Sequence, residues 1–235
     1  MQDRFIFRQI DRRDLKNFLA DGEVRSKNHH AAQKCHQTNY ENLIELRSTN
    51  AFQLPYGGVV NDYVAFYFSP VTSFTYAIHQ GQKVNVTSPD GSDLGRSSLE
   101  DRLFLVAKVQ DIAESGAYYC FSNLALNSHN NQAIISNDIS LLPQIVNWAA
   151  FDEQPKVAGI TEIGYSGVCK YFQETVGREH RRQARMAEFL VKSSVPFGLF
   201  SAIIAPNVGS FNCAQELALF YNFKGLVLHN SDCFR

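Results

Sequence analysis

Short apolar or aromatic runs recur along the sequence, separated by polar and turn-forming stretches. Runs rich in β-branched and aromatic residues are typical of strands buried in a sheet. The stretch "RFIFRQI" alternates in this way near the N-terminus, and "DYVAFYF" is a strongly aromatic run. We therefore expect strands at residues 4–10, 62–68, 102–109, 117–122, 187–191, 201–205 and 225–228.

Helical spacing of apolar residues follows the first expected strand. Leu15, Phe18 and Leu19 form an apolar stripe of this kind. Asp11 precedes the stripe as an N-terminal cap, and Gly22 follows it as a C-terminal cap. Further helices are expected at residues 110–115, 138–149 and 213–221.

Three polar stretches lack periodicity and predict loops. Residues 23–55 form a long segment of this kind, 81–98 contain the turn-rich run "SPDGSDLGRSS", and 153–167 are loop-like. No internal repeat and no Pro-, Gly- or Ser-rich linker divides the chain. The pattern predicts one α+β domain over residues 1–235, with a mixed, mostly antiparallel sheet, flanking helices and long functional loops.

The composition fits a soluble, cytoplasmic protein. Hydrophobic residues make up 45% of the 235 positions, enough for one large domain with a core. The five cysteines are odd in number and form no CxxC pair, which argues against a disulfide framework and a zinc ribbon. Asp3 and Arg4 interrupt the N-terminus where a signal peptide is apolar, and the longest apolar run is far shorter than the ~20 residues of a membrane helix. No membrane partner is expected.

The net charge of -1 excludes a generally basic, nucleic-acid-coating protein, so any attraction to phosphate must be local. Basic residues do gather in two places. The first cluster is Arg4, Arg8, Arg12, Arg13 and Lys16, and the second is Arg178, Arg181, Arg182 and Arg185. Solvated helix faces and a phosphate-binding surface both remain open as explanations.

Glu188 follows the second basic cluster, inside the expected strand "AEFLV". Strand alternation places Glu188 and Leu190 on one face and Phe189 on the other. Two interpretations are open: a strand-end glutamate that faces water, or a catalytic carboxylate that acts on a polyanionic substrate.

Other candidate sites have less support. His29, His30, Cys35 and His36 could together ligate zinc, but their spacing fits no common finger, so no metal is expected. Cys120 and Cys169 show no paired histidine, which favours incidental thiols over a nucleophile. The sequence contains no GxGxxG, Walker loop, GxSxG or HExxH motif.

Four segments, in the same order, resemble the DarT family of ADP-ribosyltransferases. "FIFRQIDRRDLKNFLADGEVRSKN" resembles the family's first strand, helix and glycine, and "DYVAFYFSPVTSFTY" resembles "DYVPFYF-x-P-R-S-P-M-L-Y". "IAESGAYYCFSNLAL" resembles "ESG…FTDG-x-A", and "RRQARMAEFLV" resembles "RRRQAEFLV". The resemblance implies the ADP-ribosyltransferase fold and transfer of ADP-ribose from NAD to a nucleic-acid base.

The resemblance also implies roles for individual residues. Glu188 would be catalytic, and a NAD-binding loop would occupy residues 22–47. The residues expected to bind NAD are Arg8, Ile10, Gly22, Asn28, Tyr67 and Tyr76. An acceptor-recognition loop would span residues 153–185, with Arg178, Arg181, Arg182, Arg185 and Tyr171 contacting the nucleic acid.

Two departures leave the acceptor open. Val71 stands where the family signature has an arginine beside the acceptor base, and residues 121–125 differ from "FTDG-x-A". Single-stranded DNA, or RNA as in CmdT-like relatives, are both possible acceptors. We expect a toxin or antiphage effector with a neutralising partner, a macrodomain or another antitoxin. The alternatives are protein ADP-ribosylation, NAD hydrolysis, a non-enzymatic nucleic-acid-binding module and, on the histidines alone, a metal-dependent nuclease.

Overall fold

A central sheet organises the computed structural model, which describes residues 3–39, 47–81, 84–126 and 133–235. Its strands are β1 (Phe5–Asp11), β4 (Tyr63–Tyr67), β7 (Arg102–Lys108), β8 (Tyr119–Ser122), β9 (Ile135–Ser136), β12 (Glu188–Lys192), β14 (Phe200–Ala205) and β15 (Leu226–His229). Within the described residues the sheet has eight strands in the order β15-β14-β7-β1-β4-β12-β8-β9. Neighbours are antiparallel except β14 and β15, which confirms the expected α+β class.

The helices and small sheets flank this sheet. The α-helices are α1 (Leu15–Asp21), α3 (Ser73–His79), α4 (Val109–Glu114), α5 (Leu142–Ile145), α6 (Ala149–Asp152), α7 (Arg181–Ala184) and α8 (Val208–Phe220). Short 3-10 turns occupy Arg12–Asp14, Val60–Asp62, Leu99–Asp101, Ile139–Leu141, Thr161–Ile163, Phe197–Leu199 and Ser231–Phe234. The small sheets pair β2 (Glu23–Arg25) with β13 (Ser194–Pro196), β10 (Lys156–Val157) with β11 (Val168–Cys169), and β3 (Gln37–Asn39) with β5 (Asn85–Thr87) and β6 (Asp93–Arg96).

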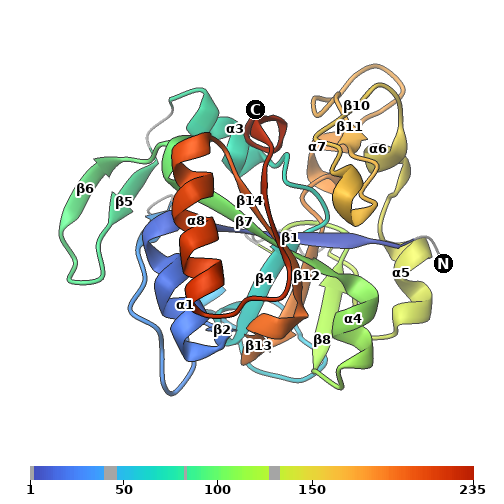
Figure 1. Ribbon diagram of the computed structural model, residues 1–235. Coiled ribbons are helices and arrows are strands. Elements are labelled where there is room, and N and C mark those ends of the chain that lie inside the picture. The colour runs from blue at the N-terminus through green and yellow to red at the C-terminus, as the bar shows by residue number, and fades with distance from the viewer. Residues whose placement is uncertain (1–2, 40–46, 82–83, 127–132) are drawn as a thin grey trace.

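Figure 1 shows how these elements are arranged. Helices α1 and α8 lie side by side over the sheet, the β5–β6 hairpin projects at one edge, and α6, α7, β10 and β11 gather at another. None of the described helices combines the length and apolar character that a bilayer span requires.

Strand β12 separates two apolar clusters. Phe189 and Val191 belong to the main core, whereas Leu190 packs with Tyr63 and Cys120 in a second cluster on the other face. The predicted alternation is therefore confirmed. Glu188 is the first residue of this strand and pairs in register with Tyr67 of β4, so the two residues are direct neighbours across the sheet.

The helix predicted after the first strand is also found, with both caps. Asp11 accepts a hydrogen bond from the Arg13 backbone N–H at the start of the 3-10 turn that leads into α1. Gly22 ends α1 with a left-handed φ of 71°, and its N–H donates to the Leu19 carbonyl. An L side chain is disfavoured at this φ, which explains the glycine.

Two expected features of the chain proved wrong. Residues 81–98 were expected as a loop, but β5 and β6 form a hairpin in which Ser88 and Gly91 build the turn. Most residues of β5 and β6 are polar, so these strands lack the alternation of apolar and polar residues that would have predicted them. Residues 138–149 were expected as one helix, but Val146 is extended (ψ 126°) and separates α5 from α6.

Phe189 tests the energetic role of the main core. Its ring stacks on Tyr119 at 5.2 Å and on Phe121 at 6.4 Å, and its side chain is completely buried. Phe189→Ala should lower the free energy of unfolding by about 3–5 kcal/mol, because it removes buried contacts and leaves a cavity. Urea denaturation measures this. The control Phe220→Ala, at a side chain 79% exposed, should change stability by less than about 0.5 kcal/mol.

Gly22→Ala tests the cap of α1. The left-handed φ of 71° is retained only with strain once a Cβ is present, so stability should fall by about 1–2 kcal/mol. Gly198→Ala is the matched control, because Gly198 has no left-handed φ and open space around its Cα. Equal effects of the two substitutions on the unfolding midpoint would rule out the capping role.

Candidate active site

The carboxylate of Glu188 is completely buried, which overturns its interpretation as a solvent-facing glutamate. Arg47 donates to both of its oxygens, Nη1 to Oε1 at 2.9 Å and Nη2 to Oε2 at 2.9 Å. Oε1 also accepts the Leu126 N–H at 3.3 Å and the Tyr67 hydroxyl at 3.5 Å. A forked guanidinium with further donors is what a buried carboxylate needs to remain charged.

A cleft of about 550 Å³ lies beside this pair. Its volume is within the roughly 300–1,000 Å³ of ligand pockets. Arg47 and Tyr67 form part of the wall, whereas Glu188 lies behind them and does not line the cleft. Other wall residues include Arg8, Gln9, Ile10, Asp14, Ser26, Lys27, His36, Thr72, Ser73, Phe74 and Met186.

The cleft has a cationic wall with unused hydrogen-bonding capacity. Arg8 donates through Nη1 to the Ala65 carbonyl at 2.9 Å. Among the described residues, Nε of Arg8 and Oε1 of Gln9 are buried atoms without a hydrogen-bond partner. Burial lowers the pKa of Arg8, and the nearby charge of Arg47 lowers it further. Because such unsatisfied atoms are costly, their position on the wall favours a polar, anionic ligand.

The electrostatics of Arg47 and Tyr67 follow from Glu188. Burial alone would lower the pKa of Arg47, but the adjacent Glu188 charge outweighs it and raises that pKa above its ordinary value. Burial and the same carboxylate raise the pKa of the Tyr67 hydroxyl. Tyr67 therefore stays neutral and can donate to Glu188.

Asp14, the last residue of the 3-10 turn that precedes α1, holds the segment after β2. Its Oδ1 lies 2.7 Å from Nδ1 of His36, and its Oδ2 accepts the His36 backbone N–H at 2.9 Å. Burial raises the pKa of Asp14, although its bonds to His36 act against this rise. His36 thus has a structural partner, and the described residues contain no group of three metal-ligating side chains.

Three residues expected to bind NAD lie away from the wall of the cleft. Gly22 caps α1, Asn28 bonds to Asp62 at 2.7 Å, and Tyr76 is 43% exposed on α3. None of these three residues lines the cleft, and their contact with NAD stays a prediction. Arg8, Ile10 and Tyr67 line the cleft, and their contact with NAD stays a prediction.

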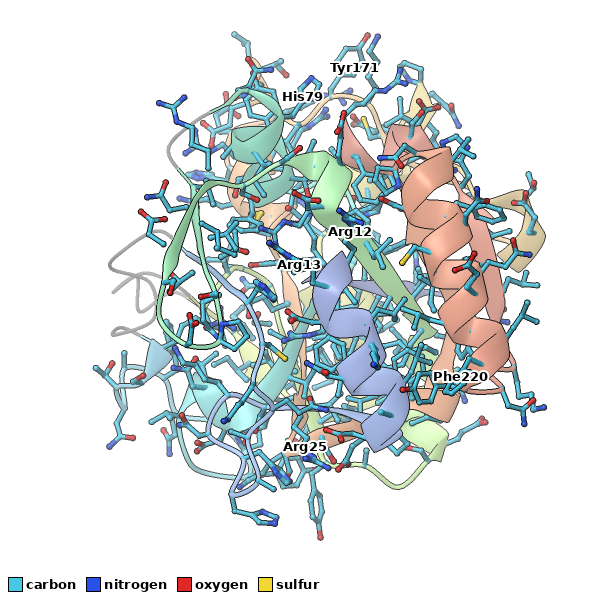
Figure 2. The ribbon with its side chains drawn as sticks, turned by 60° about the vertical axis from the view of Figure 1, so that its left-hand side comes forward. Arg12, Arg13, Arg25, His79, Tyr171 and Phe220 are labelled. Atoms are coloured by element: carbon cyan, nitrogen blue, oxygen red, sulfur yellow. The ribbon has the colours of Figure 1, made fainter. Side chains whose placement is uncertain are left out.

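The residues expected to contact nucleic acid divide into exposed and buried groups. Arg178, Arg182 and Tyr171 are exposed, and Figure 2 shows Tyr171 projecting from the edge of the molecule. Arg178 also pairs with Glu153.

Arg181 and Arg185 require a correction, because both are buried and have partners inside the protein. Arg181 pairs with Glu153 and donates to the Tyr171 carbonyl at 3.2 Å. Helix α7 was not predicted, and its spacing turns positions 181 and 185 to the same inward side. These two side chains are unavailable to bind phosphates.

Of the two departures from the family signatures, one contacts Glu188 directly and the other contacts Arg185, three residues before Glu188 in the sequence. Val71 is buried, and its carbonyl accepts hydrogen bonds from Ser69 and Arg185. Ser122, in the altered segment 121–125, accepts the Glu188 backbone N–H at 3.3 Å. The altered segment therefore still supports the strand that carries Glu188.

Arg47, Gln9 and Met186 were not individually identified from the sequence. Met186 lines the cleft, and its sulfur accepts from the Ser73 hydroxyl at 3.2 Å. Arg47 lies at the end of the expected NAD-binding loop, but nothing in its local sequence distinguishes it from a solvated arginine. Only the family loop boundary pointed toward it.

Comparisons with known proteins agree with this architecture. The DNA ADP-ribosyl transferase of Thermus sp. (strain 2.9) is 26% identical over 191 residues, covering 81% of this chain and 75% of the relative. The structure of Thermus sp. 2.9 DarT in complex with NAD+ superposes with a TM-score of 0.75 at 20% identity, covering 100% of this chain and 99% of that one.

A second solved structure, Thermosipho africanus DarTG in complex with ADP-ribose, has a TM-score of 0.63 at 16% identity and covers 98% of this chain and 51% of that one. These likenesses confirm the expected ADP-ribosyltransferase fold. The family model described as "ssDNA thymidine ADP-ribosyltransferase, DarT" matches residues 7–229. With nearly its whole length matched, this chain belongs to the DarT family.

Proposed function

We propose that this protein transfers ADP-ribose from NAD to a base of single-stranded DNA. The observation that carries the proposal is the Glu188–Arg47 pair, buried against a cleft with a cationic wall. Family membership supports the same reaction. The Thermus relative has also been solved in complex with ADP-ribosylated ssDNA, which supports DNA as the acceptor.

The cleft suits a dinucleotide with a pyrophosphate. Arg8 and Arg47 both face it, and a planar guanidinium can donate two parallel hydrogen bonds to phosphate oxygens. The unpartnered Nε of Arg8 and Oε1 of Gln9 offer one further donor and one acceptor. NAD would satisfy atoms that the folded chain leaves without partners.

Glu188 is suited to cleavage of the bond between nicotinamide and ribose. The bond breaks with its electron pair leaving on nicotinamide, and positive charge develops on the ribose as in glycoside hydrolysis. A fixed carboxylate stabilises that charge, and it can accept the proton released when a base nitrogen attacks. Because Arg47 and Tyr67 stand between Glu188 and the cleft, Arg47 must turn aside for a ribose hydroxyl to reach the carboxylate.

Exposed residues near the start of β12 can hold the acceptor strand. Arg178 and Arg182 can contact phosphates, and Tyr171 can stack on a base. Val71 provides no cation at this edge, so the acceptor base would be held by packing and neutral hydrogen bonds. RNA is tested beside DNA for this reason.

The proposed activity implies a toxin with a neutralising partner, acting in the cytoplasm. A covalently modified base cannot serve as a template for copying. This chain covers 51% of the Thermosipho africanus DarTG chain, so about half of that relative lies outside the matched part. Expression in bacteria should arrest growth, and Glu188→Gln should relieve the arrest. Normal growth with an enzyme active in vitro would count against the toxin role.

The first test incubates the protein and NAD with DNA and RNA oligonucleotides of each base. Mass spectrometry should show addition of one ADP-ribose to a DNA oligonucleotide. Glu188→Gln should slow transfer by about 10²–10³-fold, because one preorganised charge is lost. The control Glu216→Gln, at an exposed position on α8, should keep full activity. A folded Glu188→Gln protein with wild-type activity would remove Glu188 from catalysis, and modification of RNA alone would replace the acceptor.

The second test asks whether Arg47 and Glu188 form one energetic unit. Arg47→Ala should lower the free energy of unfolding by about 3–5 kcal/mol, because it leaves a buried carboxylate without its cation. Adding Glu188→Gln should restore part of that loss, giving a coupling energy of about 0.5–3 kcal/mol in a double-mutant cycle. Additive effects in urea denaturation would show that the two side chains are not paired in solution.

A further inference from the structure

Arg185 is a buried cation with an unusual set of partners. Its side chain is fully buried, and among the described residues it forms no ion pair with a carboxylate. Its guanidinium instead donates to backbone carbonyls. The acceptors are Cys169 at 2.9 Å, Ala150 at 3.3 Å, Tyr171 at 3.3 Å and Val71 at 3.4 Å.

The contacts of Arg185 join three parts of the chain. Three of its four carbonyl acceptors belong to residues 149–172, here called the loop module, which comprises α6, β10 and β11. The fourth, Val71, lies between β4 and α3, where the family signature carries its acceptor-side arginine. Arg185 itself stands three residues before Glu188.

Aromatic rings of the same module enclose the guanidinium. Its Cζ lies 5.3 Å from the ring centroid of Phe151 and 5.4 Å from that of Phe172. Burial lowers the pKa of Arg185 to about 10, so the side chain remains charged at neutral pH and its donors are retained. Charged donors make stronger hydrogen bonds to carbonyls than neutral ones do.

Other contacts hold the module at its far side. Arg4 makes a bidentate pair with Asp152 near the start of β1, and Asn230 donates to the Gly159 carbonyl at 2.7 Å. These contacts approach from β1 and the C-terminal segment. Arg185 is continuous with β12, so it links the module directly to the strand that begins with Glu188.

We propose that Arg185 is a positioning residue, which sets the distance between the loop module, whose Tyr171 can stack on a base of the acceptor strand, and the carboxylate of Glu188. This inference rests on the proposed function, because the acceptor is the nucleic acid named there. Arg185 touches neither NAD nor the base. It acts through the main chain of Val71, Cys169 and Tyr171, and displacements of about 1 Å between reacting groups can cost about 10²-fold in rate.

The test compares Arg185→Lys and Arg185→Met with Arg235→Lys, an exposed arginine at the C-terminus. Lysine keeps the charge but cannot span the carbonyls in a planar fork, and methionine removes the charge. Transfer from NAD to a DNA oligonucleotide should fall by about 10–100-fold in both variants, with a larger fall for Met. NAD affinity, measured by calorimetry, should stay within about 2-fold of wild type, since Arg185 does not line the cleft. Arg235→Lys should match wild type in both measurements.

Hydrogen exchange followed by mass spectrometry supplies a second readout that does not depend on activity. Amides of residues 149–172 should exchange faster in the Arg185→Lys protein, while those of β1 and β7 should be unchanged. Unaltered exchange in the module, or a loss of NAD affinity equal to the loss of transfer, overturns the positioning role. If the wild-type protein transfers nothing to any oligonucleotide, the proposed function fails, and the exchange measurement alone decides whether Arg185 positions the module.

Discussion

A carboxylate removed completely from water must receive a counter-charge and hydrogen-bond donors, and this requirement shapes the surroundings of Glu188. Arg47 supplies both through its planar fork, while Tyr67 and the Leu126 N–H contribute from β4 and from the segment after β8. The net stabilisation from such a pair is small, because desolvating both ions offsets much of their attraction. Its importance is geometric, since a charge held by four donors has little freedom to move.

The same constraint applies to Arg185, whose buried side chain is a cation. There, a buried guanidinium is balanced by carbonyl dipoles and aromatic faces instead of a carboxylate. Two buried side chains of opposite charge type, Arg185 and Glu188, therefore lie three residues apart at the start of β12, and each is held by segments distant in sequence. Packing of apolar residues gives the sheet its stability, while these polar contacts join the strand β12 and the residues just before it to segments distant in sequence.

Local patterns predicted the strands of the central sheet except the two-residue strand β9. Three of the confirmed features depend only on residues close together in the sequence. They are the aromatic run before Ser69, the alternation of Phe189 with Leu190 and the glycine at position 22. Arg47 could not be found in this way, because it lies 141 positions from Glu188 and its loop has no periodicity.

The arginines of the second basic cluster show where the sequence was misread. Both pairs, 181/185 and 178/182, have a spacing of four residues, so spacing alone does not separate them. Helix α7 begins at Arg181, which leaves Arg178 outside the helix and places Arg182 on another face than Arg181 and Arg185. Recognising the short helix α7 would have separated the buried pair from the exposed pair. The acceptors of Arg185 are main-chain carbonyls, which residue types do not reveal, and the carboxylate partner of Arg181, Glu153, lies 28 positions away, so both sets of partners could come only from the fold.

The three-stranded sheet of β3, β5 and β6 has a consequence for how this protein can diverge. Gln37 and Thr38 of β3 line the cleft, and among the described residues β3 pairs with the hairpin and not with the central sheet. Insertions or deletions in the hairpin can therefore widen or narrow one side of the cleft while the central strands keep their register. The β5–β6 hairpin is therefore a part of the molecule where sequence changes can alter access of a nucleotide to the cleft without altering the central sheet.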